Sequence, residues 1–101
     1  MKDEKGFFTM LGFAAKARKA VAGESNVEAA LKKKQAELLI AAEDINPKRL
    51  EHWQRASKEN GVKIVSAGTQ EQNGAAMGLS ARAIVAVNDR QMKEAILARI
   101  E

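Results

Sequence analysis

The residues best suited to bind another molecule lie around Gly23, where a short apolar run, residues 20–22, gives way to an amphipathic helix. The first turn of a helix presents backbone N–H groups that have no partner within the helix, and these groups attract anions. Basic side chains occur on both sides of this point, namely Lys16, Arg18, Lys19, Lys32, Lys33 and Lys34. The pattern predicts an anion-binding corner surrounded by positive charge.

The excess positive charge is confined to the first third of the chain. Residues 1–34 contain eight Lys or Arg and four Asp or Glu, whereas residues 35–101 contain nine of each, and the net charge is +4. A localised basic surface raises the local concentration of a polyanion such as RNA. On charge alone, a solvated basic face without a ligand remains the alternative.

The sequence offers little for an enzyme. His52 has no second histidine or cysteine to complete a metal site, and we expect it at the surface of its helix. Glu43 and Asp44 follow an apolar run, a place where α/β sheets often bind ligands, but a cap for the following segment is the simpler interpretation of Asp44. Residues 74–78 lack the lysine and the Ser or Thr of a phosphate-binding loop. We therefore expect no catalytic residue, no metal and no cofactor.

The composition of the chain limits its cellular compartment and its number of domains. The chain has no cysteine, so a disulfide framework and a thiolate metal site are excluded, and a cytoplasmic location is expected. The longest apolar runs are far shorter than the roughly twenty residues of a membrane-spanning helix. The start of the chain lacks the apolar stretch of a secretory signal. With 101 residues and 46% apolar composition, we expect one domain, residues 1–101, and a monomer.

Helices are expected where apolar residues recur at three- and four-residue spacing. Ser25 with Glu28, and Thr69 with Gln72, form capping-box patterns at the start of two of them. Asn46, followed by Pro47, is expected to start a third helix, and Asn88 or Asp89 is expected to cap the last one. The expected helices are residues 6–19, 25–34, 47–60, 69–78 and 89–100. Strands are expected in the short apolar stretches between the helices, at residues 20–22, 38–42, 62–66 and 83–87.

Two of these stretches, residues 38–42 and 83–87, are apolar without alternation. This pattern is typical of strands that are covered on both faces. Helices that alternate with strands at such short separations predict an α/β fold. We expect a three-layer α/β/α sandwich with a small four-stranded mixed sheet, in which these two stretches are the interior strands.

The order and spacing of several segments carry a family resemblance. The segments are residues 11–19 (Leu-Gly-Phe-Ala-Ala-Lys-Ala-Arg-Lys), Gly23 opening a helix, residues 36–44 (Ala-Glu-Leu-Leu-Ile-Ala-Ala-Glu-Asp), and Gly74 followed by Gly78-Leu79. Together they resemble the kink-turn-binding ribosomal protein superfamily. That superfamily includes large-subunit ribosomal proteins, Gadd-type proteins, a spliceosomal and nucleolar particle protein, and small bacterial ribosome-associated paralogues. The resemblance implies an α/β sandwich that binds sharply bent RNA.

In that family the second helix starts Gly-X-Asn-Glu-X-X-Lys, and these side chains contact sheared guanine–adenine pairs. Mapped without a gap, the three polar positions fall on Ser25, Asn26 and Ala29, and all three differ here. An asparagine both donates and accepts hydrogen bonds, so Asn26 can still address a base edge with a different preference. Ala29 has no charge, and we expect Lys33, one turn further along the same face, to compensate in part.

The family's second contact is the loop after the fourth helix, residues 79–82 here. Leu79 and Ala81 suit apolar contact with extruded bases, and Arg82 suits a phosphate or stacking on a base. Ser25 as a simple helix cap, and Leu79 as cover for the edge of the core, remain alternatives. The predicted RNA-binding residues are Lys16, Arg18, Lys19, Gly23, Glu24, Ser25, Asn26, Ala29, Lys32, Lys33, Glu43, Leu79, Ser80, Ala81 and Arg82.

Two functions from different classes remain open at this point. The first is a ribosomal or ribosome-associated protein that recognises kink-turn-type RNA, ribosomal or regulatory, beside ribosome or assembly proteins. The second is a protein-interaction module on the same scaffold that has lost specific kink-turn recognition. The basic segments favour the first function, and the substituted helix motif favours the second.

Overall fold

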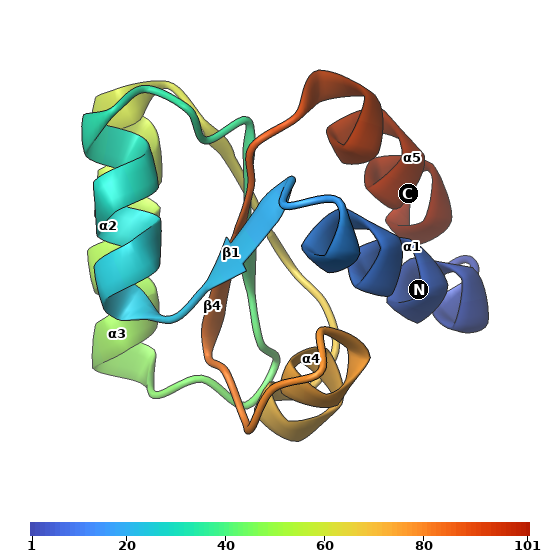
Figure 1. The fold of residues 1–101 in the computed structure, drawn as a ribbon. Helices are drawn as coiled ribbons and strands as arrows, with labels where there is room; N and C mark the ends of the chain where they lie inside the picture. The colour runs from blue at the N-terminus through green and yellow to red at the C-terminus, as the bar shows by residue number, and fades with distance from the viewer.

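The computed structural model describes residues 1–101, with one four-stranded sheet at the centre of the molecule (Figure 1). The strands are β1 (Ala20–Ala22), β2 (Leu38–Ala41), β3 (Lys63–Ser66) and β4 (Ile84–Val87), in the order β1-β4-β2-β3. Strand β4 is antiparallel to β1 and to β2, whereas β2 and β3 are parallel. The predicted mixed sheet of four strands is confirmed.

Five helices cover the two faces of this sheet, as Figure 1 shows. Helices α2 (Glu24–Lys32) and α3 (Pro47–Asn60) lie side by side on one face. The other face carries α1 (Glu4–Lys16), α4 (Gln70–Ala76) and α5 (Arg90–Ile100). Each face has its own cluster of buried apolar residues. The three-layer α/β/α architecture is therefore confirmed.

The two interior strands are β2 and β4, as their apolar sequences predict. Every residue of both strands is buried. Alternate side chains enter opposite layers: Leu38 and Ile40 pack with the cluster under α1 and α5, and Leu39 packs with the cluster under α2 and α3. Strand β2 ends one residue before its apolar run and β4 begins one residue after the start of its run, but the Ala42 N–H still donates to the Ala83 carbonyl at 2.9 Å.

Three of the expected helix starts are confirmed. Thr69 and Gln72 form a complete capping box at α4, and the Asp89 carboxylate accepts from the Met92 N–H at the start of α5. Asn46 caps α3 through its side-chain oxygen, with Pro47 at the first helical position. These caps depend on side chains that bond backbone groups only two or three residues away.

The capping box predicted for Ser25 and Glu28 is wrong. Helix α2 begins at Glu24, directly after Gly23, which has a φ of +96°, and no side chain caps it. Glycine adopts this positive φ without steric cost, so the chain enters the helix one residue earlier than the capping pattern requires. Ser25 therefore lies inside the first turn and is exposed.

Helices α1 and α2 end two or three residues earlier than their periodicity predicts, because each is followed by a residue in the left-handed region. Arg18 has a φ of 60° and Lys34 a φ of 58°. The Arg18 N–H donates to the Ala15 carbonyl and the next N–H to Ala14, and the same pair of bonds closes α2. This is the Schellman arrangement, in which glycine usually takes the left-handed position.

Replacing Arg18 and Lys34 together by glycine is expected to leave the free energy of unfolding within about 1 kcal/mol of the native value. Relief of left-handed strain contributes about 1–2 kcal/mol per residue. The greater freedom of glycine in the unfolded chain costs about 0.4–1 kcal/mol, and each lost charge at a helix C-terminus about 0.3–1 kcal/mol. Urea denaturation measures the resulting change in the free energy of unfolding. A loss above about 2 kcal/mol would show that these exposed side chains make stabilising contacts.

Candidate nucleic-acid interface

Two segments that are far apart in the sequence meet where β1 ends and β4 begins. The Gly23 N–H donates to the Ile84 carbonyl at 3.0 Å. A Cβ on Gly23 would lie 3.8 Å from Nε and 3.9 Å from Cδ of Arg82. The start of α2, residues 23–26, and the loop of residues 79–82 therefore form one surface, which we call the Gly23 corner.

Close backbone contact with α4 holds the loop in this position. The Leu79 N–H donates to the Gly74 carbonyl at 2.8 Å, and the Arg82 N–H donates to the Gln70 carbonyl at 2.9 Å. A Cβ on Gly74 would collide with the carbonyl oxygen of Ser80 and would lie 2.6 Å from its carbonyl carbon. Only glycine at position 74 lets the loop pass this close to the helix.

Asp44 connects the end of β2 to the same helix. Its carboxylate accepts from the Gln70 N–H at 2.9 Å, and the Gln70 side-chain amide donates to the Asp44 carbonyl at 3.0 Å. The expectation that Asp44 caps the segment after it is wrong, because it stabilises the start of α4, 26 residues away. Glu43 is exposed beside it, and its N–H donates to the Gly68 carbonyl at 2.7 Å.

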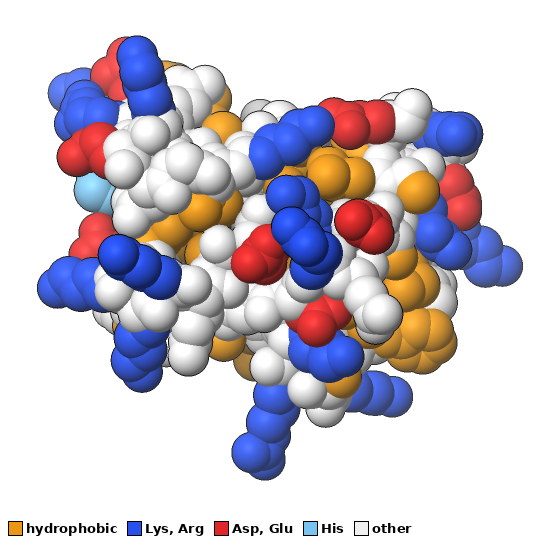
Figure 2. Space-filling view, turned by 90° about the horizontal axis from the view of Figure 1, so that it is seen from above, with side chains coloured by type: hydrophobic (Ala, Val, Ile, Leu, Met, Phe, Trp, Pro, Cys, Tyr) orange, Lys and Arg blue, Asp and Glu red, His pale blue; other side chains and the backbone are white.

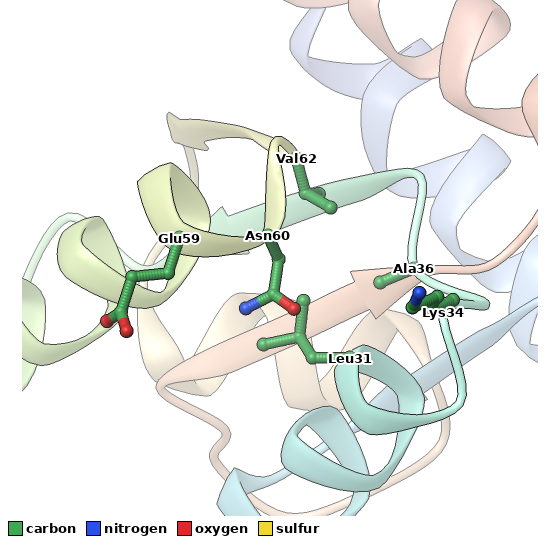
Figure 3. Close-up of a pocket in the computed structure, with 6 residues that line it drawn as sticks. All are labelled: Leu31, Lys34, Ala36, Glu59, Asn60 and Val62. Atoms are coloured by element: carbon green, nitrogen blue, oxygen red, sulfur yellow. The ribbon is translucent and has the colours of Figure 1, made fainter.

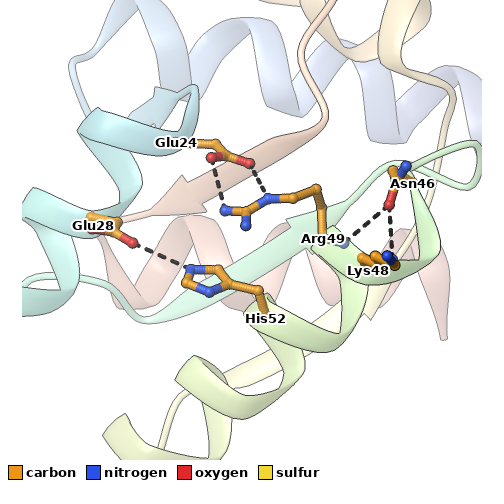
Figure 4. Close-up of polar contacts among 6 residues, drawn as sticks. All are labelled: Glu24, Glu28, Asn46, Lys48, Arg49 and His52. Atoms are coloured by element: carbon orange, nitrogen blue, oxygen red, sulfur yellow. Dashed lines mark hydrogen bonds and ion pairs between the residues drawn. The ribbon is translucent and has the colours of Figure 1, made fainter.

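The first turns of α2 are tied to α3 by two polar contacts (Figure 4). The Arg49 guanidinium donates to both carboxylate oxygens of Glu24, from Nε at 2.7 Å and from Nη2 at 2.8 Å. Nε2 of His52 lies 3.2 Å from Oε1 of Glu28. His52 also packs edge-on against the Trp53 ring, and its side chain is 34% exposed, so it lies at the surface of α3 as expected.

The expected outward face of α2 is present. Asn26, Ala29 and Lys33 line one shallow hollow of about 150 Å³, together with Gln35 and Asn88. The Asn26 side-chain NH₂ donates to the Ala22 carbonyl at 3.0 Å, which leaves its amide oxygen as an acceptor. Helix α2 thus presents a polar stripe that runs away from the Gly23 corner.

The cations expected around the start of α2 lie instead at the opposite end of the sheet. The Lys19 carbonyl accepts from the Asn88 N–H, just after β4 ends. Lys32 lies eight residues beyond Glu24, which is about 12 Å along a helix. Strand β1 runs from this far end of the sheet to Gly23, and α2 runs from Gly23 back to the far end. The cations that precede and follow Gly23 in the sequence are therefore remote from Gly23 in space. The prediction that they surround the corner is wrong.

Arg49 and Gln70, which position the corner, were not predicted from the sequence. Their partners, Glu24 and Asp44, are 25 and 26 residues away. No local spacing pattern marks such contacts, because each depends on how two separate elements pack. Gly74, a glycine inside a short helix, is the one sequence signal that could have indicated a close approach in this region.

Other hollows lie away from the Gly23 corner. One of about 360 Å³ opens between the C-terminal ends of α2 and α3, where Lys34, Glu59 and Asn60 lie around apolar side chains (Figure 3). No group of three or more His, Asp or Glu side chains is arranged to hold a metal ion. None of the helices has the length and apolar character needed to cross a membrane.

Comparison with solved structures places this fold among known ones. A protein of unknown function from Bacillus halodurans C superposes with a TM-score of 0.87 and 24% identity, over 93% of this chain and 95% of that chain. The 15.5kD RNA binding protein of Giardia lamblia superposes with a TM-score of 0.78 and 18% identity, over 95% of this chain and 82% of that chain. At these identities the likeness establishes the fold.

Among curated protein sequences, none matches this chain significantly. The family comparison is decisive, because residues 7–97 match the Ribosomal protein L7Ae/L30e/S12e/Gadd45 family. The match includes every strand and most of α1 and α5. The chain therefore belongs to this family, whose members are mostly non-catalytic proteins that bind structured RNA, kink-turn binders among them.

Proposed function

We propose that this chain is a cytoplasmic, monomeric, single-domain protein that binds kink-turn-type RNA through the Gly23 corner, as a ribosomal or ribosome-associated factor. The observation that carries the proposal is the meeting of the uncapped start of α2 with Arg82 on one surface. In this family the same two elements, the second helix and the loop after the fourth, contact bent RNA. The RNA-binding protein of Giardia lamblia, which shares the fold, supports the same partner class.

The corner supplies three kinds of contact for such an RNA. The N–H groups in the first turn of α2 have no side-chain cap, so they can donate to phosphate or base acceptors. Nη1 of Arg82 donates to the Ser80 and Ala81 carbonyls, which orients the guanidinium and leaves its other donors for RNA. Leu79 is 43% exposed and suits contact with an extruded base.

Departures from the family motif alter the expected recognition. Asn26 offers an amide oxygen where the family has a carboxylate, and its NH₂ is already bonded to Ala22. Ala29 leaves the next turn of the stripe uncharged, and Lys33 lies one turn further along it. We therefore expect recognition to depend on the backbone donors of α2 and on Arg82 more than on side chains of the helix motif.

The decisive experiment compares a kink-turn RNA with the same RNA in which Watson–Crick pairs replace the sheared pairs. We expect tighter binding to the kink-turn RNA. Arg82→Ala and Asn26→Ala are each expected to weaken that binding by about 1–3 kcal/mol, or about 5- to 150-fold, because a buried partner group is left unpaired. Fluorescence anisotropy measures the affinity, and circular dichroism verifies that the variants remain folded.

Arg55→Ala is the matched control, because Arg55 is an exposed cation on α3, outside the Gly23 corner. It should leave the preference for kink-turn RNA unchanged. Equal affinity of the native protein for the two RNAs, or unchanged affinity in both corner variants, would show that the Gly23 corner is not the recognition site.

A protein-interaction module is the second candidate. It is favoured by the charge around the corner: residues 23–24, 42–49, 67–72 and 77–83 contain four Asp or Glu and three Lys or Arg. This end of the sheet therefore provides no general attraction for a polyanion. Absence of binding to both RNAs would favour this candidate.

A further inference from the structure

The end of the sheet opposite the Gly23 corner is strongly basic. Residues 16–19, 32–37 and 88–90, which we call the basic end, contain seven Lys or Arg and two carboxylates. Its excess of +5 is larger than the net charge of the whole chain, which is +4. Figure 2 looks onto the molecule from above Figure 1, where α2 ends and α5 begins, and shows Lys and Arg side chains projecting around this face, with Asp and Glu side chains among them.

The two carboxylates leave most of the positive charge of this surface unpaired. Asp89 bonds the Met92 N–H at the start of α5, and its other oxygen lies 3.6 Å from Lys19 Nζ. Glu37 is half-buried between Ala36 and β2. No acidic partner within 4 Å is present for Arg18, Lys33 or Lys34, so their charges are directed to solvent.

The backbone conformation at this end also distinguishes the cations from ordinary surface charges. Four helices end in the Schellman arrangement, and α3 and α4 place Gly61 and Gly78 in the left-handed position. At the ends of α1 and α2 the same position is occupied by Arg18 and Lys34. Residues other than glycine adopt this left-handed conformation only with strain. Both strained positions carry a cation, and both lie at the basic end.

Polar amides accompany these cations. Gln35 and Asn88 line the hollow of about 150 Å³ beside Lys33. A side-chain amide both donates and accepts, as does the ribose 2′-hydroxyl of RNA. The same hollow reaches Asn26 on α2, so it connects the Gly23 corner with the basic end along this helix.

We propose that the basic end is a second RNA-binding surface, on which Arg18, Lys33 and Lys34 hold the phosphate backbone of an RNA duplex arm. The surface is distinct from the Gly23 corner and lies at the other end of α2. It provides the electrostatic part of RNA affinity that the corner lacks. The inference extends the proposed function but does not depend on kink-turn recognition.

The test uses two RNAs, a kink-turn RNA with short arms and the same RNA with one arm lengthened by a full helical turn. The native protein should bind the longer RNA more tightly and with a steeper dependence on salt. The double variant Arg18→Gly/Lys34→Gly removes two cations while relieving the two strained positions. It should lose the gain from the longer arm, keep its affinity for the short RNA, and melt at an unchanged or higher temperature.

The loss of two phosphate contacts should reduce the slope of log affinity against log salt by about 1.8. Between 50 and 200 mM salt, affinity for the longer RNA should therefore fall about tenfold more in the native protein than in the variant. Lys5→Gln/Arg55→Gln is the matched control, because it removes the same charge from exposed positions outside the basic end. This control should retain the native slope.

An equal loss of slope in the control, or no loss in the double glycine variant, would overturn the proposal. Equally tight binding to polyglutamate of matched charge would also overturn it, because the surface would then be a general polyanion site. If the arm-length gain depends on Arg18 and Lys34 while the bent and unbent RNAs bind alike, the basic end is supported and the kink-turn function fails. If bent RNA is preferred without any arm-length gain, the reverse holds.

Discussion

Gly74→Ala is expected to displace the loop of residues 79–82 and to weaken binding of kink-turn RNA about 5- to 150-fold, as much as the loss of Arg82 itself. The added Cβ would collide with the Ser80 carbonyl group and would lie 3.0 Å from the Cα of Ala81. Both neighbours are backbone, so the loop must move, and such overpacking costs about 1–3 kcal/mol of stability. Thermal unfolding and anisotropy together measure the two effects.

Gly61→Ala is the control for this prediction. Gly61 ends α3 with a φ of +64°, and a Cβ there would meet no atom within 4 Å. The substitution therefore introduces left-handed strain of about 1–2 kcal/mol without moving the loop. It should lower the melting temperature and leave RNA affinity unchanged. If Gly74→Ala binds RNA as the native protein does, the loop has no part in recognition.

Trp53→Ala is expected to lower the free energy of unfolding by about 3–5 kcal/mol, and the melting temperature by roughly 12–40 °C. Trp53 is fully buried in the layer between the sheet and the helices α2 and α3. Its removal leaves a cavity beneath the helix that forms one half of the Gly23 corner. Circular dichroism is the required measurement, because Trp53 is the only tryptophan of the chain.

Trp53→Phe separates the effect of packing from that of the indole group. Trp53 Nε1 is buried without a hydrogen-bond partner, so its loss removes an unsatisfied donor together with some volume. The expected cost is below about 2 kcal/mol, because an aromatic ring still fills most of the site. A cost equal to that of Trp53→Ala would contradict the conclusion that Trp53 stabilises the protein mainly through packing.

The sequence alone determined the architecture. The apolar runs identified β2 and β4 as interior strands, because a strand that is buried on both faces cannot alternate with polar residues. Thr69 and Asn46 identified two helix starts and the pair Asn88-Asp89 a third, because a cap is made within three residues of chain. The segments that resemble the family, from residue 11 to residue 87, indicated the family that the comparison of residues 7–97 then established.

Only the tertiary structure decided where charge and contacts lie. The cations on either side of Gly23 are close to it in the sequence. However, the start of β1 and the C-terminus of α2 both lie at the basic end, so these cations are separated from the Gly23 corner. Glu24 and Asp44 find Arg49 and Gln70 across more than twenty residues of chain. Such contacts depend on the direction in which each element runs and on which elements pack together. Local periodicity and capping patterns carry no information on either, because they describe only neighbours along the chain.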